Sequence, residues 1–254
     1  HIMQDIAAAE GVNLSHAFKA VPVPQEVLHA VQVGDIILLD DSKMKLEVMD
    51  KTKDLTLGIC VKAKVIHGGI LKSYKSIKIR DRYVEMPVLT ERDLENLDHA
   101  KAYGVTALMQ PFVLCGQNLR DVRNVLRDKG IHEIQIFAKI ENRIGVAHLD
   151  EILPEADVIV IARGDLGNDM PLWELPAVQK QIEDKCKAYK KPYIVVTQML
   201  ASMEQSPVPT RAEVSDIYHA VYHGAWGVMI TGESAIGKYP VEAVKYLANV
   251  AATV

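Results

Sequence analysis

The sequence predicts an α/β protein in which a parallel sheet, built from repeated βα units, is joined to a small all-β domain. After Pro87, short apolar runs rich in β-branched residues alternate with amphipathic segments. These runs are apolar throughout, which is typical of strands buried on both faces of a parallel sheet. Repeated βα units indicate either an open doubly wound sheet or a β/α barrel.

The part after Pro87 predicts strands and helices in alternation. Amphipathic segments at residues 119–129 and 211–223 predict helices, and Gly130 and Gly224 follow them. Glycine just past a helix end is a common C-terminal stop. The strands are expected at residues 106–109, 134–138, 157–162, 193–197 and 226–231.

The part before Pro87 has a different pattern, in which short strand-like runs are separated only by polar turns, as in an all-β module. These runs lie at residues 35–40, 46–49, 55–65 and 74–79. We therefore expect three regions, namely an N-terminal segment at residues 1–20, the small β module at 21–86 and the βα portion at 87–254.

Composition excludes several classes of protein. Hydrophobic residues make up 49% of the chain and charged residues 24%, as in an ordinary folded protein. A net charge of −4 offers no basic surface for nucleic acid, and no apolar run reaches the ~18 residues that span a bilayer. The N-terminus lacks a signal-peptide layout. Three scattered cysteines, Cys60, Cys115 and Cys186, are expected to be reduced, buried thiols of a cytoplasmic protein.

Polar residues stand where the apolar runs stop. In both candidate architectures the chemistry lies at the carboxyl ends of the strands, so these residues form the candidate functional site. The strand ends are Lys139-Ile-Glu141, Ala162-Arg-Gly-Asp165, Thr197-Gln198 and Thr231-Gly-Glu233.

Glu141 and Asp165 end consecutive runs, and two such carboxylates can converge on one hard cation such as Mg²⁺. A bound cation can polarise a carbonyl and stabilise an enolate. The alternative is that each carboxylate lies on the surface and caps the next helix. Lys139 leaves the same face of its strand as Glu141. It either neutralises charge that develops during the reaction or forms an ion pair with Glu141, and these two roles are compatible.

Thr197 ends a buried run, and its hydroxyl either takes part in proton transfer or bonds a backbone carbonyl. The glycines of residues 164–167 would let backbone amides approach an anion. Thr210 and Glu213 fit a capping box at a helix start. The other polar residues that stand out are assigned no catalytic role: Asp150, Glu151, His148, His219 and His223.

Five segments together resemble the motifs of pyruvate kinases, in family order and at family-like spacing. They are residues 138–142, 162–167, 197–200, 209–213 and 232–240. Residues 33–41, 68–73 and 89–93 look like the later part of the small β lid of that family and its return to the barrel. The resemblance covers about residue 31 to the C-terminus. It implies a TIM barrel of pyruvate-kinase type, present in part, with an inserted β domain and a possible barrel remnant at residues 1–20.

The resemblance also implies a role for each site residue. Glu141 and Asp165 would hold Mg²⁺ or Mn²⁺, and Lys139 would assist phosphoryl transfer and stabilise the enolate. The turn after Arg163 would hold the substrate carboxylate through backbone amides, and Thr197 would assist protonation of the enolate carbon. The implied substrate-binding residues are Ala162, Arg163, Gly164, Asp165 and Thr197. In the family, these residues serve phosphoryl transfer from phosphoenolpyruvate to ADP.

Other family motifs are absent or altered. Nothing matches the first-strand Thr-Ile-Gly-Pro-like motif or the third-strand motif that helps to bind K⁺ and phosphate. Gly11 and Leu114 stand where arginines belong, in Gly11-Val-Asn-Leu-Ser-His16 and Pro111-Phe-Val-Leu114. The usual C-terminal regulatory domain is not seen. The family residues that this chain retains would bind the metal, the substrate carboxylate and the enolate. Those that it lacks bind phosphate, K⁺ and nucleotide in the family, so binding of ADP or ATP is doubtful.

Three functions follow as hypotheses. The first is a pyruvate kinase whose missing segments are supplied. The second is metal-dependent enolate chemistry on a 2-oxo acid, such as pyruvate enolisation or oxaloacetate decarboxylation, without kinase activity. The third is a non-catalytic ligand-binding or scaffold relative. Five strands are predicted where a closed barrel needs eight. Segments are therefore missing, another chain completes the sheet, or the barrel is open, and we expect a homo-oligomer.

Overall fold

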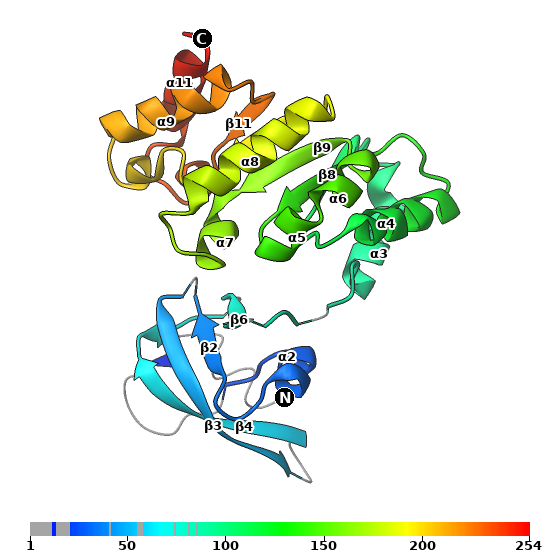
Figure 1. Cartoon of the computed structure of the whole chain (residues 1–254), viewed down its shortest axis with the longest axis vertical. Helices are drawn as coiled ribbons and strands as arrows, with labels where there is room; N and C mark the ends of the chain where they lie inside the picture. Colours follow the sequence, from blue (N-terminus) through cyan, green and yellow to red (C-terminus); the bar gives the residue numbers. More distant parts are fainter. Residues whose placement is uncertain are drawn as a thin grey trace. The chain divides into compact units, whose positions relative to one another are not determined.

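The structure is a computed structural model of the 254-residue chain. It describes residues 12–13, 21–40, 42–54, 58–73, 75–80, 82–84 and 86–254. The chain divides into two compact units, His1–Pro87 and Val88–Val254 (Figure 1). Of the expected N-terminal segment, only β1 (Val12–Asn13) is described, and it pairs antiparallel with β5 (Ile70–Leu71). The rest of that segment, including Gly11, lies outside the described residues.

The first unit contains a four-stranded antiparallel sheet in the order β4-β3-β2-β6. Its strands are β2 (Ile36–Leu39), β3 (Met44–Asp54), β4 (Gly58–His67) and β6 (Ile77–Ile79), with the short helix α2 (Gln25–Ala30) before them. Each strand overlaps one of the four strand-like runs in the sequence. Val31, Met44 and Ile79 are at most 2% exposed and form the centre of a small separate core.

The second unit is built on a five-stranded parallel sheet in the order β11-β10-β9-β8-β7. Its strands are β7 (Ala107–Gln110), β8 (Gln135–Ile140), β9 (Val158–Ala162), β10 (Tyr193–Val196) and β11 (Gly227–Met229). Neighbours in space are also neighbours in the chain, without the reversal of strand order that marks a doubly wound sheet. The arrangement is therefore that of a β/α barrel, present as five consecutive strands.

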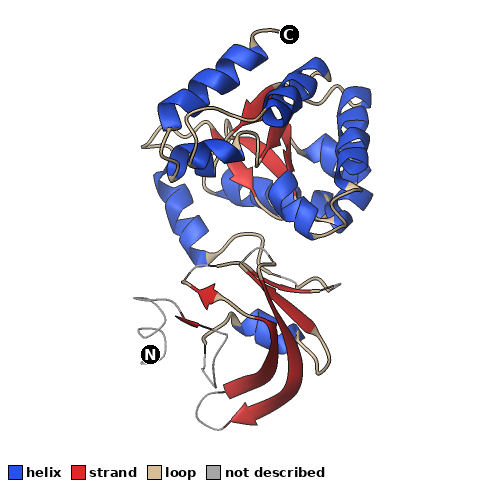
Figure 2. Ribbon diagram, turned by 90° about the vertical axis from the view of Figure 1, so that its left-hand side faces the viewer, coloured by secondary structure: helices blue, strands red, loops and turns tan. Residues whose placement is uncertain are grey.

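Helices surround these strands, which lie inside a ring of helices in Figure 2. The helices are α3 (Glu91–Ala100), α4 (Gly116–Asp128), α5 (Arg143–Ala147), α6 (Leu149–Glu155), α7 (Arg163–Asn168), α8 (Leu175–Ala188), α9 (Arg211–Tyr222), α10 (Gly232–Ala235) and α11 (Pro240–Ala251), together with the 3₁₀ helix η1 (Ala201–Glu204). In the part of the chain that the structure describes, no helix is both long and apolar enough to cross a membrane.

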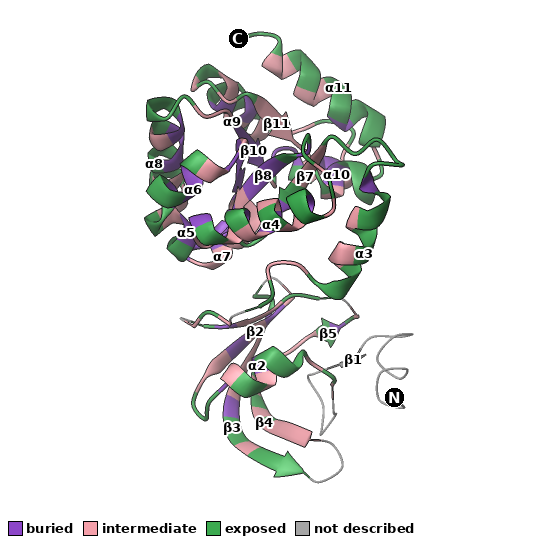
Figure 3. Ribbon diagram, turned by 90° about the vertical axis from the view of Figure 1, so that its right-hand side faces the viewer, coloured by how far each residue is buried: buried purple, intermediate pink, exposed green. Residues whose placement is uncertain are grey.

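Both faces of the parallel sheet are buried, as the continuous apolar runs predict. Every residue of β9 is buried, and β8 and β10 are largely buried in Figure 3. One face packs against the helices through Ile136, Ile159 and Val195. The opposite, inner face forms a second cluster of Phe137, Val158, Val160, Ala162, Ile194 and Val196.

The predicted helix ends are confirmed. Thr210 Oγ1 accepts a hydrogen bond from the Glu213 amide, and the Glu213 carboxylate accepts one from the Thr210 amide, which completes the capping box of α9. Gly130 and Gly224 have φ of +69° and +90°, conformations that glycine adopts without steric cost. Asp150 is exposed and pairs with Lys185, as expected for a surface residue.

Several details of the sequence prediction are wrong. Strand β8 continues to Ile140, past the predicted end at residue 138, and β11 ends at Met229 rather than at residue 231. The strand expected at residues 193–197 ends at Val196, because Thr197 has a φ of +79° and cannot continue a strand ladder. Only one of the three cysteines is buried. All three are free, but Cys60 and Cys115 are only partly buried. Burial raises the pKa of the Cys186 thiol to about 12, so this thiol is protonated at neutral pH.

Candidate active site

The strand register brings the predicted site residues to one edge of the parallel sheet. Ile140 pairs with Ile161 and Ala162 pairs with Val196. The residue that follows each strand, such as Glu141 and Thr197, therefore lies at the same carboxyl edge. This edge is where parallel βα folds collect their functional groups.

Glu141 is a buried carboxylate that is held in place by two contacts. Its side chain has no exposed surface, and Oε1 lies 2.6 Å from the Lys139 ammonium. Its other oxygen, Oε2, accepts a hydrogen bond of 2.6 Å from the Phe112 amide, at the end of β7. Buried charges are stable only when they are paired, so the ion pair between Lys139 and Glu141 is confirmed. The Lys139 side chain remains 26% exposed and can meet a ligand.

Two carboxylates follow neighbouring strands at this edge of the sheet. Glu141 Oε1 is buried and makes no hydrogen bond, its close contact being the Lys139 ammonium. Asp165 lies half-buried in the first turn of α7, after the neighbouring strand β9. Among the residues that the structure describes, no group of three or more His, Cys, Asp or Glu side chains is placed to hold a metal. The protein thus offers two carboxylates, and Mg²⁺ is commonly held by one or two, with substrate and water as its other ligands.

Thr197 has a strained backbone at the start of the loop after β10. Its φ is +79° and that of Gln198 is +57°. A positive φ is a genuine outlier for a β-branched residue, and such a conformation costs on the order of 1–3 kcal/mol. The Thr197 side chain packs on Gly164, where a Cβ atom would lie 2.8 Å from Thr197 Cγ2. The glycine is therefore required by this close approach.

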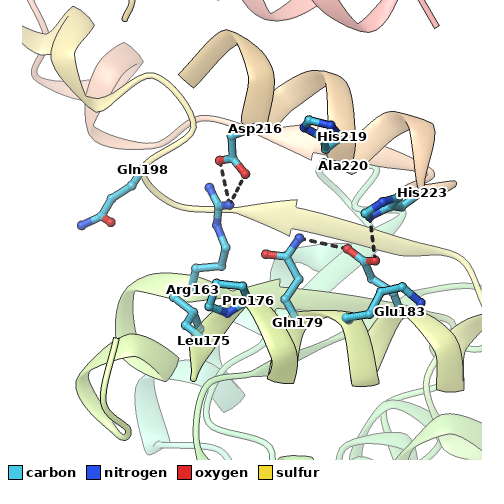
Figure 4. Close-up of a pocket in the computed structure, with 11 residues that line it drawn as sticks. Arg163, Leu175, Pro176, Gln179, Glu183, Gln198, Asp216, His219, Ala220 and His223 are labelled. Carbon is cyan, nitrogen blue, oxygen red and sulfur yellow. Dashed lines mark hydrogen bonds and ion pairs between the residues drawn. The ribbon is translucent and has the colours of Figure 1, made fainter. Parts of the chain in front are cut away.

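The Arg163 side chain turns away from solvent and binds protein groups. Its Nη2 and Nε donate to the Thr197 carbonyl at 2.9 and 3.3 Å. Its Nη1 lies 2.7 Å from Asp216 Oδ2, on α9 (Figure 4). Only 11% of the Arg163 side chain is exposed. Among the predicted substrate-binding residues, the Arg163 side chain is therefore already bound to Thr197 and Asp216. Its backbone amide is the first of helix α7.

The loop after β7 is held by its own backbone and by neighbouring helices. Phe112 has a φ of +50°, and the Leu114 amide donates to Asn118 Oδ1 at 2.9 Å. A Cβ atom on Gly145 would lie 2.5 Å from the Val113 carbonyl, so this loop also packs tightly against α5. The loop is thus well held, and the side chain that it offers at residue 114 is a neutral leucine.

The structure adds groups that sequence reasoning missed. The backbone amide of Phe112 and the carboxylate of Asp216 both contact predicted site residues. No sequence pattern marks either one, because an amide has no side chain to recognise and Asp216 lies on a helix far along the chain.

A cavity of about 330 Å³ adjoins this region, between α8 and α9. It is lined by Arg163, Gln198 and residues of the two helices (Figure 4). His219 and His223, which the sequence left without a role, line it as well. His223 Nδ1 lies 3.2 Å from the buried carboxylate of Glu183.

Comparison with known proteins identifies a family for this chain. A family model described as "Pyruvate kinase, barrel domain" matches residues 13–244. The chain is 41% identical to a pyruvate kinase of Bacillus licheniformis over 225 residues, which are 89% of this chain and 38% of that protein. It is 40% identical to one of Debaryomyces hansenii over 227 residues, 89% and 44% of the two chains. For one of Aeropyrum pernix, identity is 39% over 231 residues, 91% and 49%.

The chain therefore spans less than half the length of these curated relatives. The match nevertheless includes the five parallel strands and every residue of the candidate site. With nearly the whole chain covered at about 40% identity, the chain belongs to the pyruvate kinase family.

Proposed function

We propose that this chain carries the metal- and enolate-binding half of a pyruvate-kinase site, and that in a complete site it serves phosphoryl transfer from phosphoenolpyruvate to ADP. The observation that supports this most is the buried pair of Lys139 and Glu141 at the same sheet edge as Thr197. A buried ion pair contributes little to stability on its own account. Its place at a strand end, with the lysine still accessible, suits a catalytic use better than a structural one.

The proposed metal ligands are Glu141 and Asp165. When bound there, Mg²⁺ or Mn²⁺ would supply a Lewis acid that polarises the substrate carbonyl. Glu141 is already deprived of water, so its Oε1, which lies beside the Lys139 ammonium, would bind a cation without losing hydration. The K⁺ on which the family relies is not assigned to any residue here.

The remaining steps belong to the protein side chains and backbone. The backbone amides from Arg163 to Asp165 open α7 and have no partners within that helix, so they can bind the substrate carboxylate. Lys139 lies where its charge can stabilise the enolate oxygen. The Thr197 hydroxyl takes the proton from the methyl carbon as it passes its own to solvent. The C–H electron pair forms the new carbon–carbon double bond, and the π pair of the carbonyl moves onto its oxygen, which becomes the enolate oxygen.

The test follows the methyl protons of pyruvate in D₂O by proton NMR, with Mg²⁺ present. Wild-type chain should exchange them, and Lys139→Met should lower the rate by about 10²-fold, the usual effect of losing one stabilising charge. Lys185→Met is the matched control, because Lys185 also pairs with a carboxylate, Asp150, but on exposed helices. Equal rates for Lys139→Met and wild type would refute the proposal.

A second function, enolate chemistry without kinase activity, is favoured by Leu114. This position carries no positive charge, although its loop is joined to Glu141 through the Phe112 amide and to α4 through Asn118. Losing one cationic clamp on a transferring phosphate costs ~10³-fold or more in rate. The chain alone should therefore exchange pyruvate protons, or decarboxylate oxaloacetate, while making little ATP from phosphoenolpyruvate and ADP. A coupled ATP assay beside the NMR assay decides this, and robust ATP synthesis would exclude it.

A further inference from the structure

The segment after β10 starts with two residues in an unfavourable conformation. Thr197 and Gln198 have φ of +79° and +57°, and neither is glycine. A strained backbone persists only where its surroundings hold it. The groups that hold this segment can be read from its hydrogen bonds.

Arg163 provides the closest restraint. Two of its guanidinium nitrogens donate to the Thr197 carbonyl, at 2.9 and 3.3 Å. A forked pair of donors on one oxygen fixes the orientation of the peptide plane that follows Thr197, which a single donor does not. Rotation of this plane would turn the carbonyl away from both nitrogens at once.

Asp216 in turn holds Arg163. Its two carboxylate oxygens lie 2.8 and 2.7 Å from Arg163 Nη1. Figure 4 shows the arginine extending from the end of β9 to this carboxylate on α9. The Arg163 side chain is 11% exposed and that of Asp216 is 35% exposed. Without Asp216, the arginine would keep its charge but lose the contact that directs its other nitrogens at Thr197.

Two further carboxylates fix the rest of the segment. Buried Glu233 accepts a hydrogen bond from the Leu200 amide at 3.0 Å. Glu213 accepts from the Ser202 amide at 2.8 Å and from its hydroxyl at 2.6 Å. Residues 197–202 are thus tied to α7, α9 and α10 by charged side chains, and only the Thr197 end carries the backbone strain.

We propose that Arg163 and Asp216 are positioning residues that keep Thr197 in its left-handed conformation and so hold its hydroxyl beside Gly164. This inference rests on the proposed function, in which that hydroxyl carries a proton. Neither residue touches the reacting atoms. They act through Thr197, and a misplacement of about 1 Å of a catalytic group can cost 10²-fold in rate.

The kinetic test uses the pyruvate exchange assay on the whole chain. Asp216→Asn and Arg163→Lys should each lower the maximal exchange rate by ~10 to 10²-fold. The pyruvate concentration that gives half the maximal rate should not change. The double variant should be no slower than the slower of the two single variants, because both changes remove the same restraint on Thr197. Asp216→Glu should recover part of the rate, and Asp150→Asn, on an exposed ion pair, should have no effect.

The decisive comparison adds Asp216→Asn to a Thr197→Val chain. If Asp216 acts through the Thr197 hydroxyl, the added change costs nothing further. If instead it lowers the rate as much as in wild type, or if half-saturation shifts while the maximal rate does not, the inference is overturned.

A second readout does not depend on catalysis, so it separates failure of this inference from failure of the proposed function. Carbon-13 backbone shifts of Thr197 and Gln198 report the left-handed conformation directly. They should move toward extended values in Asp216→Asn and in Arg163→Lys, and should stay in place in Asp150→Asn. Unchanged shifts in a folded Arg163→Lys or Asp216→Asn protein overturn the inference, even in a chain that shows no exchange.

Discussion

At the scale of single residues, the candidate site depends on a few close contacts that leave little room for a different side chain. Glu141 is buried with one oxygen on the Phe112 amide and the other beside the Lys139 ammonium. Thr197 lies directly on Gly164. Both contacts join the ends of neighbouring strands, so each depends on the register of the sheet as well as on the residue itself.

Gly164 gives a prediction at this scale. In Gly164→Ala, the new Cβ would lie 2.8 Å from Thr197 Cγ2, and such overpacking costs about 1–3 kcal/mol. The free energy of unfolding, measured with urea, should fall by that amount, and pyruvate exchange should slow because Thr197 is displaced. Gly227→Ala is the control, since its Cβ would be 3.5 Å from Ile194, an ordinary contact. Equal stability and exchange in the two variants would contradict the close contact.

At the scale of elements, α9 connects the site to the core. Its first residue is capped by Thr210, and Ile217 and Ala220 are buried against the sheet side of the unit. Glu213 accepts a hydrogen bond from Ser202 in the segment after β10, and Asp216 pairs with Arg163, which donates to Thr197. One helix therefore fixes its own N-terminus and the loop that carries Thr197.

Glu213 makes the stability of this element depend on pH. Burial raises the pKa of Glu213, but hydrogen bonds from Ser202 and Thr210 lower it more, to a value below its usual 4.5. A lowered folded-state pKa means that the stabilisation is complete above pH 4.5 and is lost as pH falls through the lowered value. Glu213→Gln should therefore reduce the free energy of unfolding at pH 7 by about 1–3 kcal/mol.

This difference between wild type and Glu213→Gln should shrink as the pH falls below 4.5. Urea unfolding at pH 7 and at successively lower pH measures it. Glu151→Gln, on an exposed residue of α6, should show no such dependence. A difference that stays constant across this range would mean that the carboxylate charge is not what holds the loop.

At the scale of the whole molecule, the parallel sheet has two edges. Within the described residues, β7 pairs only with β8, and β11 pairs only with β10. An uncovered strand edge is a template for another chain. The strand order is that of a β/α barrel, as in the family to which the chain belongs. A closed barrel needs eight strands, and the described sheet has five.

We therefore predict that the chain associates with itself at micromolar concentration. Light scattering should give a mass above the 28.2 kDa of one chain. Met109→Lys should weaken the association, because Met109 is 42% exposed on the edge strand β7 and charge on an edge opposes strand pairing. Tyr103→Lys, 80% exposed before that strand, is the control. A well-folded monomer at these concentrations would refute the prediction.

Much of this architecture can be predicted from the sequence, because it follows from local periodicity. Continuous apolar runs place the five parallel strands, and glycines such as Gly130 and Gly224 place helix ends. The ordered motifs around Glu141 and Thr197 are enough to identify the family. The pairing of Lys139 with Glu141 also follows, since residues two apart on a strand share a face.

The rest depends on contacts between residues far apart in the chain, which local patterns do not encode. Thr197 sits at the end of an ordinary β-branched run, and its left-handed backbone is contacted by Arg163, which pairs in turn with Asp216. In the sequence, Asp216 looks like any other polar residue of an amphipathic helix. Its contact with Arg163 follows from the tertiary structure, which brings α9 beside the first residue of α7.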